Sequence, residues 1–150
     1  MTIHFVCRGN TYRSRLAETY LNSKGLSDIK AISSGIEADN NFSGSITWYV
    51  QRIIQKNHLQ NFAKPMWQET TKKLLNKADF TVFMQKDIYN YCSSNLGFNN
   101  KNFEVWEIND LTEAYDTDEE KIKETERIYL EIKQRVDNLL AKSTFTERGK

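Results

Sequence analysis

The chain has 150 residues, of which 39% are hydrophobic and 27% are charged, which suits one domain of ordinary size, residues 1–150, with a sizeable buried core. Its 21 basic side chains almost balance its 20 acidic ones, so the composition argues against a protein that binds nucleic acid through charge. Since no apolar stretch approaches the ~20 residues of a spanning helix and no signal peptide is recognisable, we expect a cytoplasmic protein with no membrane partner.

Short runs rich in β-branched and aromatic residues alternate with longer stretches of helical periodicity, and this alternation predicts an α/β fold with a mostly parallel sheet. Strands are expected at Thr2–Cys7, Ile29–Ser33, Ala78–Met84 and Phe103–Ile108. Helices are expected at Ser14–Lys24, from Ile46 to Ile54, near Glu69–Asn76, at Lys86–Ser94 and at Asp118–Ala141, the last of them on one face of the sheet. Within the second helix, the spacing of Trp48, Tyr49 and Ile53 is typical of core residues.

The segment between the first strand and the first helix reads Cys-Arg-Gly-Asn-Thr-Tyr-Arg-Ser. If this loop curls back on itself, its successive N–H groups form a nest for an anion, and the start of the next helix adds positive partial charge. Gly9 and Asn10 are residue types that accept left-handed backbone angles. The planar guanidinium of Arg13 suits two oxygens of a tetrahedral oxyanion. The predicted phosphate-binding residues are Arg8, Gly9, Asn10, Thr11, Tyr12, Arg13 and Ser14.

Cys7 opens this loop and is the candidate nucleophile. The helix start, the inward N–H groups and Arg13 all favour its thiolate form, and the Ser14 hydroxyl is placed to donate to the sulfur. The competing interpretation is a small buried hydrophobic residue, but the position of the motif between strand and helix favours catalysis. The only other cysteine is Cys92, and no Cys/His spacing fits a zinc site, so we expect neither a structural metal nor a disulfide framework.

These residues resemble the low-molecular-weight protein tyrosine phosphatases. That family carries Cys-x-Gly-Asn-x-x-Arg-Ser after its first strand, matched by Cys7–Ser14, and the similarity continues into Ala17-Glu18. Ser33-Ser34-Gly35 resembles the family's Ser-Ala-Gly, and Ala78–Met84 its third strand. The resemblance implies a three-layer αβα sandwich with a four-stranded parallel sheet of flavodoxin-like (phosphotyrosine phosphatase I-like) type and strand order 2-1-3-4.

The resemblance also implies an activity: removal of phosphate from protein phosphotyrosine and small aryl phosphates through a cysteinyl-phosphate intermediate, with no metal or other cofactor. The implied partners are phosphotyrosine proteins, with a tyrosine kinase as a candidate partner and phosphate or another oxyanion in the loop. Catalysis would rest on Cys7, Arg13 and a general acid.

The family's general acid is the aspartate of an Asp-Pro pair before the last helix, and Asp110 is the best match, with Asp116 as its rival. Here Leu111-Thr112 replaces the proline and an aromatic residue that often follows it. Loop position alone suggests Phe42 and Tyr115 as residues at the rim of the substrate cleft.

Two alternatives stay open. Thioredoxin-linked arsenate reductases resemble the same fold and loop but need two further thiols; Cys92 is one candidate, and Gln85 stands near the position of the other. A catalytically silent module that binds phosphotyrosine is the second alternative, favoured by the missing proline. Tyr12 occupies the position where many members of the family carry a second cysteine, so the resemblance implies that the protective disulfide of that pair is absent.

Overall fold

Four strands form a parallel sheet in the order β2-β1-β3-β4 in the computed structural model, which describes residues 1–40, 44–110 and 117–142. The strands are β1 (Thr2–Cys7), β2 (Lys30–Gly35), β3 (Phe80–Phe83) and β4 (Phe103–Val105). The strand order confirms the expected topology. Because the chain passes from β1 to β2 on one side and later to β3 on the other, the carboxyl end of β1 is the switch point where such sheets bind ligands.

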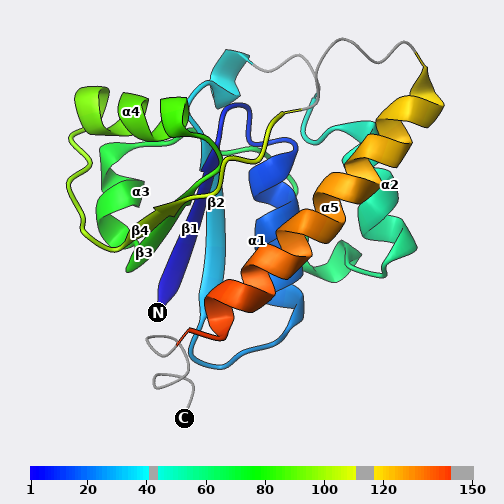
Figure 1. Cartoon of the computed structure of the whole chain (residues 1–150), viewed down its shortest axis with the longest axis horizontal. Coiled ribbons are helices and arrows are strands. Elements are labelled where there is room, and N and C mark those ends of the chain that lie inside the picture. Colours follow the sequence, from blue (N-terminus) through cyan, green and yellow to red (C-terminus); the bar gives the residue numbers. More distant parts are fainter. Residues whose placement is uncertain (41–43, 111–116, 143–150) are drawn as a thin grey trace.

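The helices cover both faces of the sheet (Figure 1), which confirms the three-layer arrangement. Helices α1, α2 and α5 lie on one side, and α3 and α4 lie on the other. Their bounds are α1 (Arg13–Ser23), α2 (Trp48–Lys56), α3 (Lys72–Lys77), α4 (Lys86–Asn95) and α5 (Asp118–Leu140), with short 3-10 turns at Ala38–Asn40 and Gln60–Phe62. Within the described ranges, no helix is long and apolar enough to cross a membrane.

Helix α5 shows how the sequence pattern becomes packing. The Thr117 side chain caps its start by accepting a hydrogen bond from the N–H of Glu120, and three acidic residues fill its first turn, where the helix dipole favours them. Its buried stripe consists mainly of Ile128, Ile132, Val136 and Leu139, and it packs against α1 and α2. The prediction of a long helix on one face of the sheet is confirmed.

Strand β1 is buried on both faces, as expected for the centre of a parallel sheet. Its register pairs Cys7 with Gly35 of β2 and Val6 with Phe83 of β3. The carboxyl ends of these strands therefore meet at one edge of the sheet. The loops that follow them converge there, beside the segment that begins at Cys7.

The observed bounds of β4 and α3 differ from the predicted bounds for clear local reasons. Strand β4 ends at Val105; Trp106 and Ile108 still donate backbone hydrogen bonds to β3 and its extension, but Glu107 has a φ of 53°, which interrupts the extended backbone. Helix α3 begins at Lys72 because Thr71 caps it, while the preceding Glu69 pairs with Gly35 as extended backbone.

Candidate active site

The loop from Cys7 to Ser14 is held by hydrogen bonds on its outer side. Four of its backbone carbonyls, those of Cys7, Arg8, Asn10 and Thr11, accept from donors elsewhere in the chain. The donors are, in that order, Ile36 N–H at 3.1 Å, Glu37 N–H at 2.8 Å, Arg15 Nη1 at 3.1 Å and Thr47 N–H at 3.2 Å. In a planar trans peptide the N–H points opposite to the C=O, so the next N–H in each unit faces the inside of the loop. Inward N–H groups of this kind are the arrangement that an anion-binding nest requires.

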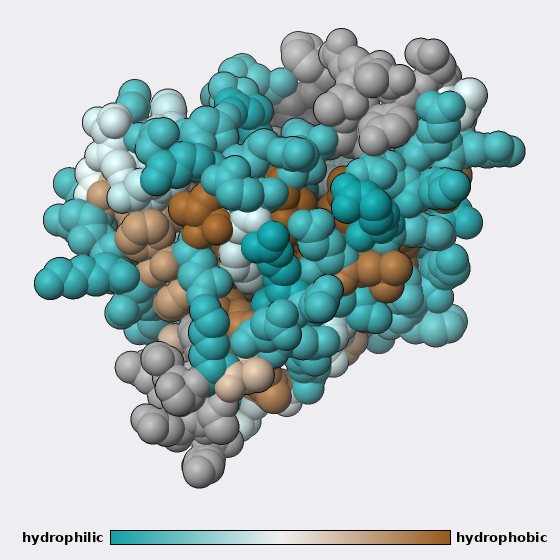
Figure 2. Space-filling view, viewed as in Figure 1, coloured by the Kyte–Doolittle hydropathy of each residue, from teal (hydrophilic) through white to brown (hydrophobic). Residues whose placement is uncertain are grey.

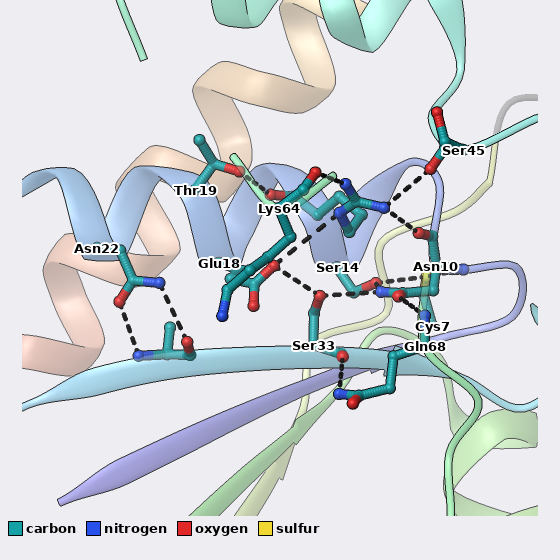
Figure 3. A network of polar contacts seen from close by, with 12 residues as sticks. Cys7, Asn10, Ser14, Glu18, Thr19, Asn22, Ser33, Ser45, Lys64 and Gln68 are labelled. Atoms are coloured by element: carbon teal, nitrogen blue, oxygen red, sulfur yellow. Dashed lines mark hydrogen bonds and ion pairs between the residues drawn. The ribbon is translucent and has the colours of Figure 1, made fainter. Parts of the chain in front are cut away.

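Asn10 fastens the loop from inside the fold (Figure 3). It has a φ of 56°, the left-handed conformation that asparagine tolerates better than most residues. Its Nδ2 donates to Ser14 Oγ at 2.8 Å and to Ser33 Oγ at 2.9 Å, and its Oδ1 accepts from Gln68 N–H at 2.7 Å. The expectation of left-handed angles is met at Asn10 but not at Gly9, whose φ is not positive.

Cys7 receives two hydrogen-bond donors. Its Sγ lies 2.8 Å from Ser14 Oγ and 3.2 Å from the backbone nitrogen of Asn10. Since the side-chain amide of Asn10 donates through Nδ2 to Ser14 Oγ, the hydroxyl hydrogen of Ser14 is free to be donated to the sulfur. Both donors stabilise negative charge on the sulfur, and the Ser14 contact is the one expected from the sequence.

Arg13 lies at the start of α1 with only 1% of its side chain exposed. Its Nη1 donates to Gln85 Oε1 and to the Ile108 carbonyl, both at 2.7 Å. Its Nη2 lies 3.5 Å from Asp110 Oδ2. Its buried Nε has no hydrogen-bond partner among the described residues, which is costly unless a ligand supplies one. An oxyanion in the loop would satisfy that donor.

A pocket of about 200 Å³ opens at the loop. Its lining residues are Cys7, Gly9, Thr11, Tyr12, Arg13, Thr47, Tyr49 and Asp110. Three residues chosen from the sequence as catalytic therefore line one cavity: Cys7 and Arg13 from the loop, and Asp110 from a distant part of the chain.

Of two neighbouring aromatic residues at the start of α2, one lines this pocket and the other packs against it from the solvent side. Tyr49 is one of its lining residues, and the Trp48 ring lies 5.1 Å from the Tyr49 ring, between centroids. Trp48 is 50% exposed, so its expected place in the core was wrong, whereas Ile53 of the same helix is buried. Helical spacing predicted the buried face of α2, but it did not show that the first turn of this helix is exposed to solvent.

The side chains of Arg8 and Tyr12 join the loop to other parts of the fold. Arg8 pairs with Glu37 at 3.2 Å and with Asp87, so it serves the loop through its backbone. Tyr12 forms a 2.6 Å hydrogen bond with Thr125 of α5, and burial raises the pKa of its hydroxyl. The loop is therefore tied to the longest helix.

Asp110 is the last residue of the described range 44–110. Its side chain is 52% exposed. Burial, together with the negative charge of Asp110, raises the pKa of Tyr49. The other residues considered for the acid or the cleft rim, Phe42, Leu111, Thr112, Tyr115 and Asp116, lie outside the described residues. In the three described ranges, no group of His, Cys, Asp or Glu residues could hold a metal ion.

Three further residues shape the site and carry no role in the sequence analysis. Gln85 orients Arg13, and Arg15 holds the Asn10 carbonyl. Gly35 lies so close to the loop that a Cβ there would come within 2.6 Å of the Arg8 carbonyl oxygen. For Gly35, the sequence offered one indication, a glycine at the end of the second predicted strand. For Arg15 and Gln85 it offered no indication, because only the folded chain brings their partners close.

The loop carries a cysteine and a buried arginine at the switch point of a parallel sheet. This combination is typical of proteins that bind oxyanions through a thiol-containing loop. The model of the family described as low molecular weight phosphotyrosine protein phosphatase matches residues 2–148. The chain therefore belongs to this family of phosphatases.

Solved structures agree on the fold. A low molecular weight protein tyrosine phosphatase from T. tengcongensis has a TM-score of 0.75 at 20% identity, over 93% of this chain and 97% of that one. The C7S mutant of the YwlE arginine phosphatase, with a phosphorylated active-site serine, has a TM-score of 0.72 at 21% identity, over 97% of this chain and 99% of that one. Wzb from Vibrio vulnificus, in complex with benzylphosphonate, gives 0.71 at 18% identity, over 89% and 94%. A comparison with curated proteins finds none that matches.

Proposed function

We propose that this phosphatase removes phosphate from protein phosphotyrosine and from small aryl phosphates through a cysteinyl-phosphate intermediate. The observation that carries the proposal is the position of Cys7, whose sulfur accepts hydrogen bonds from Ser14 and Asn10 in the same pocket as Arg13 and Asp110. This combination supplies a charged nucleophile, a bidentate anion clamp and a proton donor.

The first step transfers the phosphoryl group to sulfur. The Cys7 thiolate attacks phosphorus in line, a P–S bond forms, and the bond from phosphorus to the tyrosine oxygen breaks. The loop N–H groups and the Nε–Nη2 edge of Arg13 bind the equatorial oxygens as charge redistributes. Asp110 gives its proton to the departing phenolate oxygen.

The second step releases phosphate. A water molecule attacks phosphorus, the P–S bond breaks, and Asp110 takes up the proton that the water loses. The Ser14 hydroxyl donates to the thiolate that leaves, and the enzyme returns to its starting state with no metal taking part in either step.

The rim favours a ring as the leaving group. Tyr12 and Tyr49 pack edge to face at 5.6 Å between centroids, and Trp48 extends this row into solvent. Such rings bind another aromatic ring through offset or edge contacts. Benzylphosphonate, bound by the Vibrio vulnificus relative, has the same combination of ring and phosphorus oxyanion.

Protein phosphoarginine is the second candidate substrate. It is supported by the similarity to an arginine phosphatase and by the acceptors around the pocket, the hydroxyls of Thr11 and Thr47 and the Asp110 carboxylate. A phosphorylated guanidinium group brings N–H donors that need such acceptors.

The arsenate reductase alternative is weakened by the state of the second cysteine. Cys92 is completely buried in α4, and burial raises the pKa of its thiol to about 12. Gln85 is engaged with Arg13. The reductase reaction needs three thiols, and this chain has only two cysteines.

The test compares turnover of phosphotyrosine, phosphoarginine and phosphoserine peptides by the wild type, Cys7→Ser and the matched Cys92→Ser. We expect phosphotyrosine to be cleaved fastest, Cys92→Ser to stay active and Cys7→Ser to lose turnover while it still binds vanadate. More than a few per cent residual activity in Cys7→Ser would remove Cys7 from its role. Faster cleavage of phosphoarginine would select the second candidate, and vanadate binding without any turnover would select a silent binding module.

The general acid has its own test. Asp110→Asn should slow esters with poor leaving groups by about 100-fold or more and activated aryl esters far less, because only the former need a proton. Rates across a series of substituted phenyl phosphates measure this difference. The same pattern in Asp116→Asn, and not in Asp110→Asn, would assign the acid to Asp116.

A further inference from the structure

Arg15 is a charged residue inside the fold. It belongs to the first turns of α1 yet is only 1% exposed, and a buried guanidinium is costly unless it is paired and hydrogen-bonded. Glu18, also buried, lies 4.0 Å from its Nε and is itself held by the Ser33 hydroxyl at 2.9 Å. Glu18 thus balances the positive charge of Arg15 without a close hydrogen bond. The Nη1 and Nη2 groups of Arg15 have other partners.

Those N–H groups bind backbone carbonyls from three separate segments (Figure 3). Nη1 donates to Asn10 O at 3.1 Å and to Ser45 O at 3.0 Å, and Nη2 donates to Lys64 O. A planar guanidinium holds these carbonyls in fixed directions, whereas the three N–H donors of a lysine ammonium rotate about one nitrogen. One side chain therefore holds two other segments, at Ser45 and Lys64, against the phosphate-binding loop.

Each of the two outer segments returns to the phosphate loop a few residues later. Thr47, two residues after Ser45, donates its N–H to Thr11 O at 3.2 Å. Gln68, four residues after Lys64, donates its N–H to Asn10 Oδ1 at 2.7 Å. Arg15 thus supports the loop directly at Asn10 O and indirectly, through these two segments, at Thr11 O and the Asn10 side chain.

The direct contact bears on phosphate binding. Because the Asn10 carbonyl and the Thr11 N–H belong to one planar trans peptide, holding the carbonyl on the outer side turns that N–H toward the inside. Thr11 lines the pocket beside Cys7. We propose that Arg15 is a positioning residue that keeps the Thr11 N–H aimed at the phosphate oxygens, an inference that rests on the loop being the phosphate site of the proposed function.

The experiment uses Arg15→Met, Arg15→Lys and the matched control Arg135→Met, which changes an exposed arginine of α5. Inorganic phosphate is the probe: its Kd is measured by calorimetry, and kcat and KM are measured with p-nitrophenyl phosphate. We expect Arg15→Met to raise the phosphate Kd and KM by about tenfold, as befits a lost hydrogen bond to a charged group. Arg15→Lys should give a smaller increase, and Arg135→Met should leave all values unchanged.

A role in stability alone gives a different pattern. The thermal midpoint and the amount of active enzyme would fall in Arg15→Met, while the phosphate Kd and KM stayed within twofold of the wild type, and that result would overturn the inference. If Arg15→Met fails to fold, an unchanged Kd in Arg15→Lys has the same meaning. In the wild type, an amide proton signal of Thr11 that does not move on phosphate addition would also contradict it.

The outcomes also separate this inference from the proposed activity. Phosphate binding that depends on Arg15 without any phosphatase turnover would refute the hydrolytic function and leave the positioning role standing. Turnover with a phosphate Kd that is independent of Arg15 would refute the positioning role alone. A wild-type protein that does not bind phosphate would refute both.

Discussion

At the scale of single residues, the active loop could be predicted because its chemistry is local. Cys7, Asn10, Arg13 and Ser14 lie within eight consecutive residues, and their side-chain types already imply a nucleophile, a left-handed turn and an anion clamp. The partners that orient them could not be predicted in this way. Gln85 lies 72 positions from Arg13, and only the folded sheet brings the two side chains together.

The two cysteines should differ sharply in reactivity. Cys7 lines an open pocket, whereas Cys92 is buried and its thiol has a pKa raised to about 12, so little thiolate forms there at neutral pH. We expect iodoacetamide to label Cys7 alone, with vanadate protecting it, as measured by peptide mass spectrometry. Labelling of Cys92 in the native protein at a comparable rate would contradict this picture.

Gln85 should matter for catalysis through Arg13. Gln85→Leu removes the acceptor that holds Nη1 at 2.7 Å, and a lost hydrogen bond to a charged group costs ~1.5–3 kcal/mol. We expect kcat/KM for p-nitrophenyl phosphate to fall by about tenfold or more, with little change in thermal midpoint. The control is Gln134→Leu on the exposed side of α5; an equal loss in both variants would show that Gln85 has no special role.

At the scale of elements, the sequence located the four strands and five α-helices of the described residues, but their ends depended on neighbouring segments. β2 extends to Gly35 because that residue pairs with Cys7 and bridges to Glu69. β4 ends early because Glu107 takes a left-handed conformation. Hydrophobic spacing reports which face of an element is buried, and it carries little information about the residue at which pairing stops.

The end of β2 should tolerate no side chain. A Cβ on Gly35 would lie 2.6 Å from Arg8 O and 2.7 Å from the backbone nitrogen of Asn10, so Gly35→Ala must displace the loop. We expect the free energy of unfolding to fall by about 1–3 kcal/mol, as for other overpacked sites, and phosphate binding to weaken. Denaturant titration and calorimetry measure both effects.

Gly9→Ala is the matched comparison for stability. Its Cβ would meet Thr11 Oγ1 at 3.6 Å, an ordinary contact, and its backbone angle is not left-handed. The free energy of unfolding should therefore change by less than that of Gly35→Ala. Equal destabilisation of the two variants would show that the close approach at Gly35 is unimportant.

At the scale of the whole molecule, the fold buries a titratable group at its centre. His4 in β1 is fully buried, its Nε2 lies 2.7 Å from Ser34 Oγ, and burial lowers its pKa to about 4. Because the unfolded chain has a histidine pKa near 6.5, unfolding takes up a proton between these values. The stability that His4 contributes is complete above pH ~6.5 and is lost as the pH falls toward about 4.

That linkage can be measured. A shift of this size corresponds to a loss of about 3 kcal/mol between pH 7 and pH 4, superposed on the titration of carboxylates. His4→Gln keeps a side chain able to contact Ser34 but cannot be protonated, so its stability should decline less steeply over the same range. Parallel curves of unfolding free energy against pH for the two proteins would exclude His4 as the cause.

The outer hydrogen bonds of the Cys7–Ser14 loop have a consequence for evolution. Since the loop backbone is fixed by contacts on its outer side, the proposed binding of a phosphorylated substrate would cost little conformational entropy, whatever group the phosphorus carries. Mutations at Trp48 or in its surroundings can then alter substrate choice while the reaction centre stays intact. On the proposed function, the loop would then set the reaction and the entrance at α2 would set which phosphorylated side chain enters.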